Sequence, residues 1–301
     1  MNDSIKRVAL AIVLLFGLLL AFTSRWTVFE ADQLQSNSLN KLPLLREQQQ
    51  PRGRILARDR HLIARSVRRG RGGQATYLRR YAPPTLYAHP VGYYDVELRS
   101  TGLERYYDDQ LSNNREELLT LLDQLLARKP EGRDMTTALD PVAQQLAGAQ
   151  LAGRAGAVVV IEPATGRVPV YVSSPSYNQN LIRNPAAFAA LNKSDKKVLF
   201  DRVGQAAYPP GSTFKVVTAA AALDQALYNP SSVLNGNSPQ TFSGQPLSNS
   251  GGKSWGDISL TTALTHSVNT VWAQVGEKLG NETLFDYMQR FGFGAKPPID
   301  L

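Results

Sequence analysis

The sequence has 301 residues, of which 43% are hydrophobic and 19% charged, an ordinary globular composition with enough length for two domains. Cysteine is absent, which excludes disulfides, thiolate metal sites and a cysteine nucleophile. The three histidines, His61, His89 and His266, stand in no hydrolase motif, so a Ser-His-Asp triad is not indicated.

The net charge of +8 is concentrated in the first quarter of the chain, since residues 1–80 hold 15 Lys/Arg against 5 Asp/Glu. Much of this charge is arginine, including Arg68, Arg69 and Arg71. No zinc-finger spacing, helix-turn-helix signal or aromatic platform accompanies these arginines, so we expect no nucleic-acid partner. Anionic lipid headgroups, a pyrophosphate-linked precursor and a plain solvated surface remain open as explanations of the excess charge.

An unbroken apolar run, residues 8–22, follows Lys6 and Arg7. The run is short for a membrane span, but residues 23–26 extend it to the about 20 residues that a bilayer requires. A cleaved signal peptide would share these features, although no convincing small-x-small cleavage site follows the run. We therefore predict an uncleaved anchor within residues 1–29. The positive-inside rule then predicts a single-pass protein of the cytoplasmic membrane, with the bulk of the chain exported.

Two helical segments are predicted in the next part of the chain. Residues 30–50 are polar with spaced leucines, which suits a juxtamembrane helix or stalk that ends at Pro51-Arg52-Gly53. The leucine spacing in residues 116–129 predicts a helix, with acidic residues in its first turn and basic residues in its last.

The second half of the chain carries clearer local signals. Asp140 followed by Pro141 predicts the start of a helix that runs to about Leu151. Residues 156–174 place β-branched residues on both sides of a Pro-x-Thr-Gly turn, which predicts a β-hairpin with a glycine at positive φ. Residues 212–227 predict the most apolar helix of the exported part.

Four stretches match the pattern Ser-x-x-Lys, and they begin at Ser38, Ser194, Ser212 and Ser250. The pattern serves catalysis where a helix presents Ser and Lys one turn apart on the same face. Ser212 meets this condition, because a Pro-Pro-Gly sequence precedes it and apolar residues follow, Val216 and Val217 among them, that should bury the helix.

A serine hydroxyl needs a base to become a nucleophile, and Lys215 serves as one when it is neutral. Desolvation, a neighbouring cation and the positive end of the helix dipole would each lower the pKa of Lys215. The alternative interpretation is a serine at a helix start with an incidental lysine.

A second element, Ser267-Val268-Asn269, lies 55 residues after Ser212. Ser-x-Asn also begins at Ser38, Ser112 and Ser176, so the pattern carries no weight without its position. A Ser and an Asn on a loop between helices would be placed to relay a proton to a leaving amine and to hold a substrate amide.

The stretches YPPGSTFKVVTAAAAL at residues 208–223 and HSVNTVWAQVGEKLG at residues 266–280 resemble the first two active-site motifs of penicillin-binding proteins. The resemblance to class B members also runs, in order, through PRGRILARDRHLIA, AHPVGY, GLERYYDDQL and GAVVVIEPATGRVPVYVSSPSYNQN. It covers nearly the whole chain. The implied fold is α+β: a membrane-anchor helix in residues 1–29, a mixed α/β, dimerisation-like pedestal in residues 30–152, and part of a transpeptidase domain, an antiparallel sheet with helices, in residues 153–301.

The resemblance also implies roles for four residues: Ser212 as the acylated nucleophile, Lys215 as the general base, and Ser267 and Asn269 as proton relay and substrate contact. The implied reaction is D,D-transpeptidation, which cross-links peptidoglycan stem peptides in cell-wall synthesis. β-Lactams would acylate the same serine. No cofactor and no metal are implied, and the expected partner is a polytopic membrane polymerase that makes the glycan strands.

The third motif of the family, Lys-Thr-Gly or Lys-Ser-Gly on a sheet strand, does not occur in the 32 residues after Asn269. We therefore expect an incomplete catalytic domain with two strands of a five-stranded sheet, and no activity from residues 1–301 alone. The alternatives are a catalytically inactive scaffold of the cell-wall machinery, a penicillin sensor and a secreted β-lactamase. A sensor would need further membrane helices, and a β-lactamase would lack the anchor and the pedestal.

Overall fold

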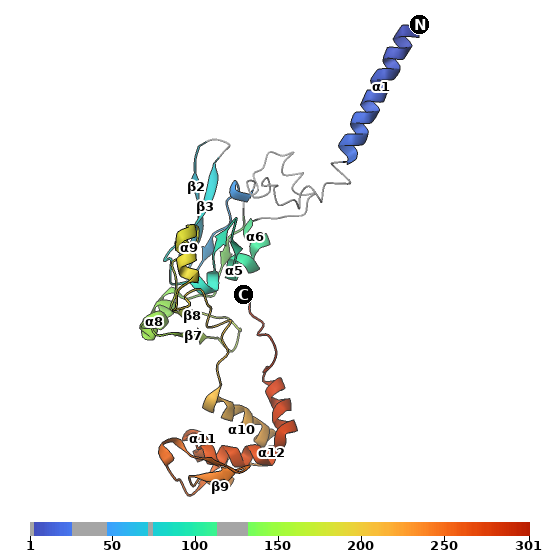
Figure 1. Ribbon diagram of the computed structural model, residues 1–301. Helices are drawn as coiled ribbons and strands as arrows, with labels where there is room; N and C mark the ends of the chain where they lie inside the picture. Colours follow the sequence, from blue (N-terminus) through green and yellow to red (C-terminus); the bar gives the residue numbers. More distant parts are fainter. Residues whose placement is uncertain (1–2, 26–46, 72–74, 113–131) are drawn as a thin grey trace. The chain divides into compact units, whose positions relative to one another are not determined.

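The computed structural model describes residues 3–25, 47–71, 75–112 and 132–301 (Figure 1). The described residues form two compact units. The first contains the chain up to Ala206 together with Asp300 and Leu301, and the second contains Ala207–Ile299. This division lies within the segment predicted as transpeptidase, so compactness alone does not mark the predicted boundary after residue 152, which stays a prediction.

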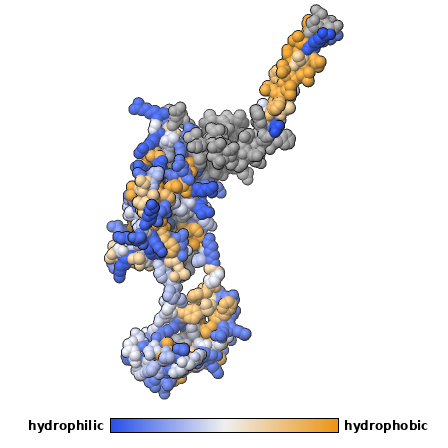
Figure 2. All heavy atoms as spheres, in the orientation of Figure 1, coloured by the Kyte–Doolittle hydropathy of each residue, from blue (hydrophilic) through white to orange (hydrophobic). Residues whose placement is uncertain are grey.

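Helix α1 (Asp3–Ser24) coincides with the predicted membrane segment. Among the described residues it is the one helix that is long and apolar enough to cross a membrane, and its apolar side chains are exposed (Figure 2). It is therefore a candidate membrane anchor. The predicted stalk in residues 30–50 lies largely outside the described residues, and the predicted helix in residues 116–129 lies wholly outside them.

A four-stranded sheet, in the order β3-β2-β1-β6, organises the first part of the first unit. Strand β2 (Leu62–Arg69) pairs antiparallel with β1 (Ile55–Leu56) and with β3 (Thr76–Tyr81), and β6 (Met135–Thr136) joins β1 in parallel. The other elements of this part are short: α4 (Ala88–Val91), β4 (Tyr94–Asp95), β5 (Arg99–Ser100), α5 (Gly102–Tyr106) and α6 (Asp108–Ser112).

A buried ion cluster joins this sheet to the helices beside it. Glu104, on α5, is fully buried and accepts hydrogen bonds from Arg79 Nε at 2.5 Å and from the Tyr81 hydroxyl at 3.1 Å. Its second oxygen pairs with Arg52 Nη2 at 3.1 Å, and Arg52 also reaches Asp108 at 2.6 Å. One carboxylate thus connects the segment before β1, strand β3 and helix α5. Because both arginines are nearly inaccessible to water, each needs this partner.

The structure confirms the helix and the hairpin predicted for residues 140–174. Helix α8 (Pro141–Leu151) begins at Asp140, whose side chain accepts the backbone N–H groups of residues 142 and 143. Strands β7 (Gly156–Val160) and β8 (Val170–Ser174) pair antiparallel, and Gly166 in the turn has φ 71°. The buried Gln144 side chain holds the hairpin to α8 by hydrogen bonds to both backbone groups of Tyr171, at 2.6 and 2.9 Å.

The hairpin has an open edge within the described residues. In the part of the chain that the structure describes, β7 and β8 pair with each other alone. Val159, Val160 and Ile161 are 40%, 44% and 58% exposed, so the end of β7 presents apolar side chains and unpaired backbone together. The first unit continues through the 3-10 turn η3 (Gln179–Leu181) and helix α9 (Pro185–Asn192).

The second unit is built around a core between α10 (Lys215–Asp224) and α12 (Asn269–Arg290). Its other elements are the 3-10 turns η4 (Gly211–Phe214) and η5 (Ser250–Gly252), helix α11 (Leu260–Thr265) and two antiparallel strand pairs, β9 (Val233–Asn235) with β12 (Asp257–Ser259) and β10 (Gln240–Phe242) with β11 (Gln245–Leu247). Val217, Ala221, Val271 and Val275 supply the centre of the core. Gly280, at φ 78°, kinks α12.

Glu104→Gln should strongly destabilise the sheet of the first unit, because it leaves the buried guanidinium of Arg79 without its described carboxylate partner and Arg52 with Asp108 alone. We expect a loss of about 3–5 kcal/mol, measured as faster amide hydrogen exchange in β2 and β3. The matched control is Asp134→Asn, which weakens the exposed pair of Asp134 with Arg54, 2.6 Å apart, and should change the exchange far less. Equal exchange in the two variants would contradict the role given to Glu104.

Candidate active site

The residues around Ser212 form a tighter turn than predicted. Ser212 lies in the 3-10 turn η4, and the α-helix starts at Lys215 and ends at Asp224 rather than at residue 227. In a 3-10 turn the side chains at positions i and i+3 eclipse each other, so Ser212 and Lys215 still share a face. The expectation that Val216 is buried is wrong, because its side chain is 55% exposed, whereas Val217 is buried.

Lys215 is the centre of the cluster. Its Nζ lies 3.3 Å from Ser212 Oγ, 2.9 Å from Ser267 Oγ and 2.7 Å from the Ser267 carbonyl oxygen. A fourth oxygen, Asn269 Oδ1, is 2.5 Å away. Burial lowers the pKa of the Lys215 ammonium below its ordinary value, since a half-buried charge loses part of its hydration. The structure thus brings together all four residues that the sequence singled out.

Ser267 reaches Lys215 through an unusual backbone conformation. Its φ is 54°, in the left-handed region that residues other than glycine seldom occupy. The conformation presents both its carbonyl oxygen and its hydroxyl to Lys215. The next residue, Val268, is 1% exposed and packs in the core between α10 and α12, so it anchors the loop to that core. Strain of this kind persists where the surrounding structure determines the backbone.

Asn269 is oriented by contacts on both sides of its amide. Its Oδ1 faces Lys215, and its Nδ2 donates a hydrogen bond to the Ser248 carbonyl oxygen at 3.0 Å. The amide is an acceptor toward Lys215 because its donor end is already engaged.

Asn249 is a residue that motif reasoning missed. It is buried, and its Oδ1 accepts hydrogen bonds from the backbone N–H and the hydroxyl of Thr270 at 3.0 and 3.2 Å. Its Nδ2 donates to the carbonyl oxygens of Gly236 and Lys253. Asn249 therefore ties the start of α12, which carries Asn269, to the loops around it. A lone asparagine in a loop offers no sequence pattern, so the structure was needed to find it.

The other Ser-x-x-Lys matches do not form such a site. Ser250 begins a 3-10 turn interrupted by Gly251 at φ 63°, Ser194 lies in a loop after α9, and Ser38 lies outside the described residues. Of the histidines, His89 packs edge-on against Tyr177 in the first unit, and His266 stacks on Trp255 at 4.3 Å between ring centres. Both rings are thus held by aromatic neighbours.

The four oxygens around Lys215 determine what a neutral amine would do there. A neutral amine donates two protons and keeps one lone pair, whereas the Ser267 carbonyl and Asn269 Oδ1 are acceptors alone. These two oxygens take the two protons, and the lone pair then faces a hydroxyl. Ser212 is placed to donate its proton to that lone pair, so the arrangement suits a serine nucleophile with a lysine base.

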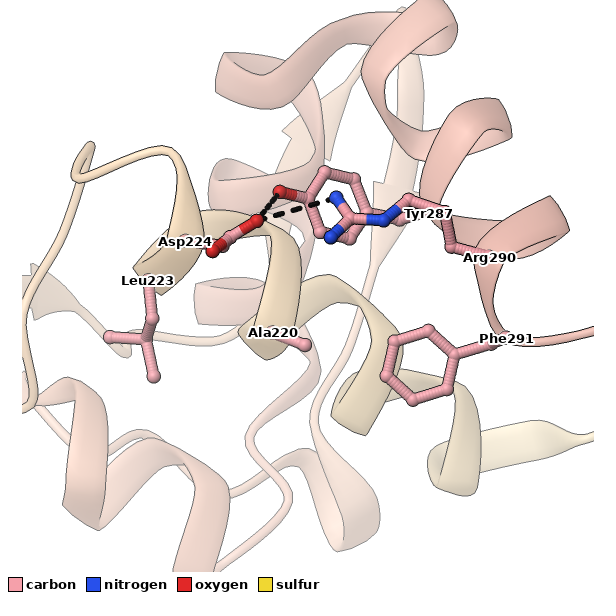
Figure 3. Close-up of a pocket in the computed structure, with 6 residues that line it drawn as sticks. All are labelled: Ala220, Leu223, Asp224, Tyr287, Arg290 and Phe291. Atoms are coloured by element: carbon pink, nitrogen blue, oxygen red, sulfur yellow. Dashed lines mark hydrogen bonds and ion pairs between the residues drawn. The ribbon is translucent and has the colours of Figure 1, made fainter.

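A separate pocket of about 510 Å³ lies between α10 and α12 (Figure 3). Asp224 accepts hydrogen bonds there from the Tyr287 hydroxyl and from Arg290, the latter at 3.3 Å. These polar groups satisfy one another beside Phe291. The pocket is at the end of α10 opposite to Lys215, so it is distinct from the four-residue cluster.

Comparison with known families covers most of the chain that follows α1. The family model of the penicillin binding protein transpeptidase domain matches residues 156–301, and that of the penicillin binding protein A dimerisation domain matches residues 52–135. The chain belongs to the penicillin-binding proteins. In this penicillin-binding protein the four clustered residues all lie within the part that matches the transpeptidase domain.

Named relatives agree with this membership. Peptidoglycan D,D-transpeptidase PbpA of Mycolicibacterium smegmatis is 37% identical over 316 residues, which cover 99% of this chain and 64% of the relative. Peptidoglycan D,D-transpeptidase MrdA of Escherichia coli K12 is 30% identical, with 75% of this chain and 41% of the relative covered. The imipenem acyl-enzyme complex of penicillin-binding protein A from M. tuberculosis has a TM-score of 0.74 and 34% identity, covering 84% of this chain and 61% of that one. The chain thus spans less than two thirds of each relative.

Asn249→Ala should unfold the second unit more easily, because it leaves the buried backbone N–H of Thr270 without an acceptor. We expect a loss of about 2–3 kcal/mol in the free energy of unfolding. Urea unfolding followed by the fluorescence of Trp255 and Trp272, which both lie in this unit, measures it. Asn237→Ala, at an exposed asparagine of the same loops, is the control, and an equal midpoint in the two variants would refute the role of Asn249.

Proposed function

We propose that the whole protein is a peptidoglycan D,D-transpeptidase that works through an acyl-enzyme on Ser212. The observation that carries the proposal is the contact of Lys215 Nζ with Ser212 Oγ at 3.3 Å, in a cluster where the other oxygens occupy the donor protons of the lysine. Family membership supports it, since the relatives PbpA and MrdA bear the name peptidoglycan D,D-transpeptidase.

In the first step, Ser212 Oγ attacks the carbonyl carbon of the penultimate D-alanine of a stem peptide while Lys215 takes the hydroxyl proton. The C–N bond to the terminal D-alanine breaks, and that residue leaves with the proton on its amine. Ser267 is placed to relay the proton, and Asn269 to hold a substrate amide. In the second step the amine of a neighbouring stem attacks the Ser212 ester, which forms the cross-link and restores the serine.

β-Lactams are proposed to acylate the same serine. The structure of the relative from M. tuberculosis is that of an imipenem acyl-enzyme complex. In this protein Ser212 is exposed and lies at the start of a helix, so a bulky acyl donor can reach its hydroxyl, and the helix dipole stabilises developing negative charge.

The proposed setting is the outer face of the cytoplasmic membrane. Lys6 and Arg7 at the start of α1 favour a cytoplasmic N-terminus, with the rest of the chain exported. The resemblance to class B penicillin-binding proteins implies a polytopic membrane polymerase that makes the glycan strands. We propose such a partner for α1.

Labelling of the whole protein with a fluorescent penicillin tests the proposal. We expect one stable adduct, which peptide mass spectrometry places on Ser212, and no adduct in Ser212→Ala. Ser194→Ala and Ser250→Ala, which alter the other described Ser-x-x-Lys serines, should label as the parent does. An unlabelled protein that still folds would favour the inactive scaffold, and an adduct on another serine would refute the site.

The acylation rate should rise with pH, because the base is the neutral form of Lys215. Burial lowers the pKa of Lys215 in the folded protein, so the midpoint of the rise should fall below the ordinary 10.5. Lys215→Arg keeps a positive charge that does not deprotonate, and it should lower the acylation rate by about 10²- to 10⁴-fold. The control is Lys278→Arg on the exposed surface of α12. A rate that falls as pH rises from 7, or a Lys215→Arg variant with the parental rate, would contradict this assignment.

A further inference from the structure

The hairpin of β2 and β3 carries a row of arginines on one face. Its register places Arg65 opposite Arg80, Val67 opposite Leu78 and Arg69 opposite Thr76. Side chains alternate between the faces of a strand, so these six share one face. Arg65, Arg69 and Arg80 are exposed, and Figure 2 shows hydrophilic side chains around this hairpin.

The opposite face of the hairpin turns toward the protein. Ala64 and Tyr81 are buried there, and so is Arg79, whose side chain pairs with Glu104. Folding of the first unit therefore accounts for Arg79 on this face, but not for the three outer arginines.

The outer arginines have no counter-charge within the described chain. Arg52, Arg54 and Arg79 each pair with a carboxylate, whereas no described carboxylate forms an ion pair with Arg65, Arg69 or Arg80. Like charges directly opposite each other on neighbouring strands destabilise the pairing. An anion held between Arg65 and Arg80 would reverse the sign of that interaction, because two guanidinium groups match the oxygens of a phosphate.

The floor beneath these arginines is apolar. A hollow of about 370 Å³ lies on the hairpin, and its lining combines Arg65 and Arg80 with Ile63, Val67 and Ala82. A small inorganic anion would use the guanidinium groups and leave the apolar floor uncovered. An anionic lipid offers both parts, a phosphate diester for the arginines and a glycerol-acyl boundary for the apolar side chains.

We propose that the outer face of the β2–β3 hairpin binds the phosphate headgroups of anionic phospholipids. The candidate anchor α1 keeps the hairpin near that surface, because a chain the length of residues 25–51 cannot span more than about 90 Å. Tethering to the membrane raises the effective concentration of lipid, so weak contacts suffice. Lipid binding accounts for Arg65, Arg69 and Arg80 without a nucleic acid and does not depend on the catalytic assignment.

A single spin label reports the docking, since the chain has no native cysteine. The whole protein with Thr76→Cys is labelled and reconstituted through α1 into nanodiscs, either of phosphatidylcholine or of equal parts phosphatidylcholine and phosphatidylglycerol. We expect phosphatidylglycerol to protect the label from a water-soluble nickel chelate, and high salt to reverse the protection. Each arginine near an anionic surface contributes about fivefold, so Arg65→Gln, Arg69→Gln and Arg80→Gln together should lower the docked-to-free ratio about a hundredfold.

The control carries the same change in charge elsewhere on the first unit, with Arg105→Gln, Arg133→Gln and Arg167→Gln, and should dock as the parent does. Equal protection in the two lipids, or equal docking of the two triple variants, would overturn the proposal. A further arm adds inorganic phosphate or glycerophosphoglycerol to the anionic nanodiscs. Release of the hairpin by these soluble phosphates at concentrations that leave the ionic strength unchanged would overturn the lipid as ligand, whereas continued protection supports it.

Discussion

The candidate site depends on the contacts of one amine, that of Lys215. A single nitrogen contacts the Ser212 hydroxyl in the turn and the carbonyl oxygen of Ser267, which lies 52 residues after Lys215. Two acceptors that cannot donate, the Ser267 carbonyl and Asn269 Oδ1, dictate where its protons go. The chemistry proposed for Ser212 therefore rests on which oxygens accept the protons of Lys215 as much as on the lowered pKa of that lysine.

The packing of the second unit makes that arrangement possible. Val217 on α10 and Val268 in the loop belong to the same apolar core, so the lysine and its acceptors are positioned by the packing of their neighbours. Asn249 holds the start of α12 by accepting two hydrogen bonds from Thr270. The site is thus a property of one compact unit, whereas the ion cluster around Glu104 performs the corresponding structural work in the other unit.

Local signals in the sequence were sufficient for several elements. The N-cap at Asp140, the hairpin with Gly166 in its turn and the apolar helix α1 depend on neighbouring residues, and all three are present as predicted. The grouping of Ser212 with Ser267 and Asn269 came from resemblance to a family, since each motif alone matches elsewhere in the chain. Interactions between distant segments could not be predicted from the sequence. The contacts of Glu104 with Arg52 and Arg79, and of Asn249 with Thr270, follow no spacing rule. The exposure of Val216 was misjudged because apolar character alone does not say which face of a helix is covered.

The left-handed backbone conformation of Ser267 also limits which residues can replace it. Threonine carries the same hydroxyl, but its branched Cβ is poorly compatible with a φ of 54°. Glycine would accept the backbone and lose the hydroxyl, and asparagine would accept it with a longer, different donor and acceptor pair. Serine combines a hydroxyl with tolerance for this conformation. The position is consequently closed to the usual hydroxyl-for-hydroxyl exchange, and its identity is maintained by geometry as well as by chemistry.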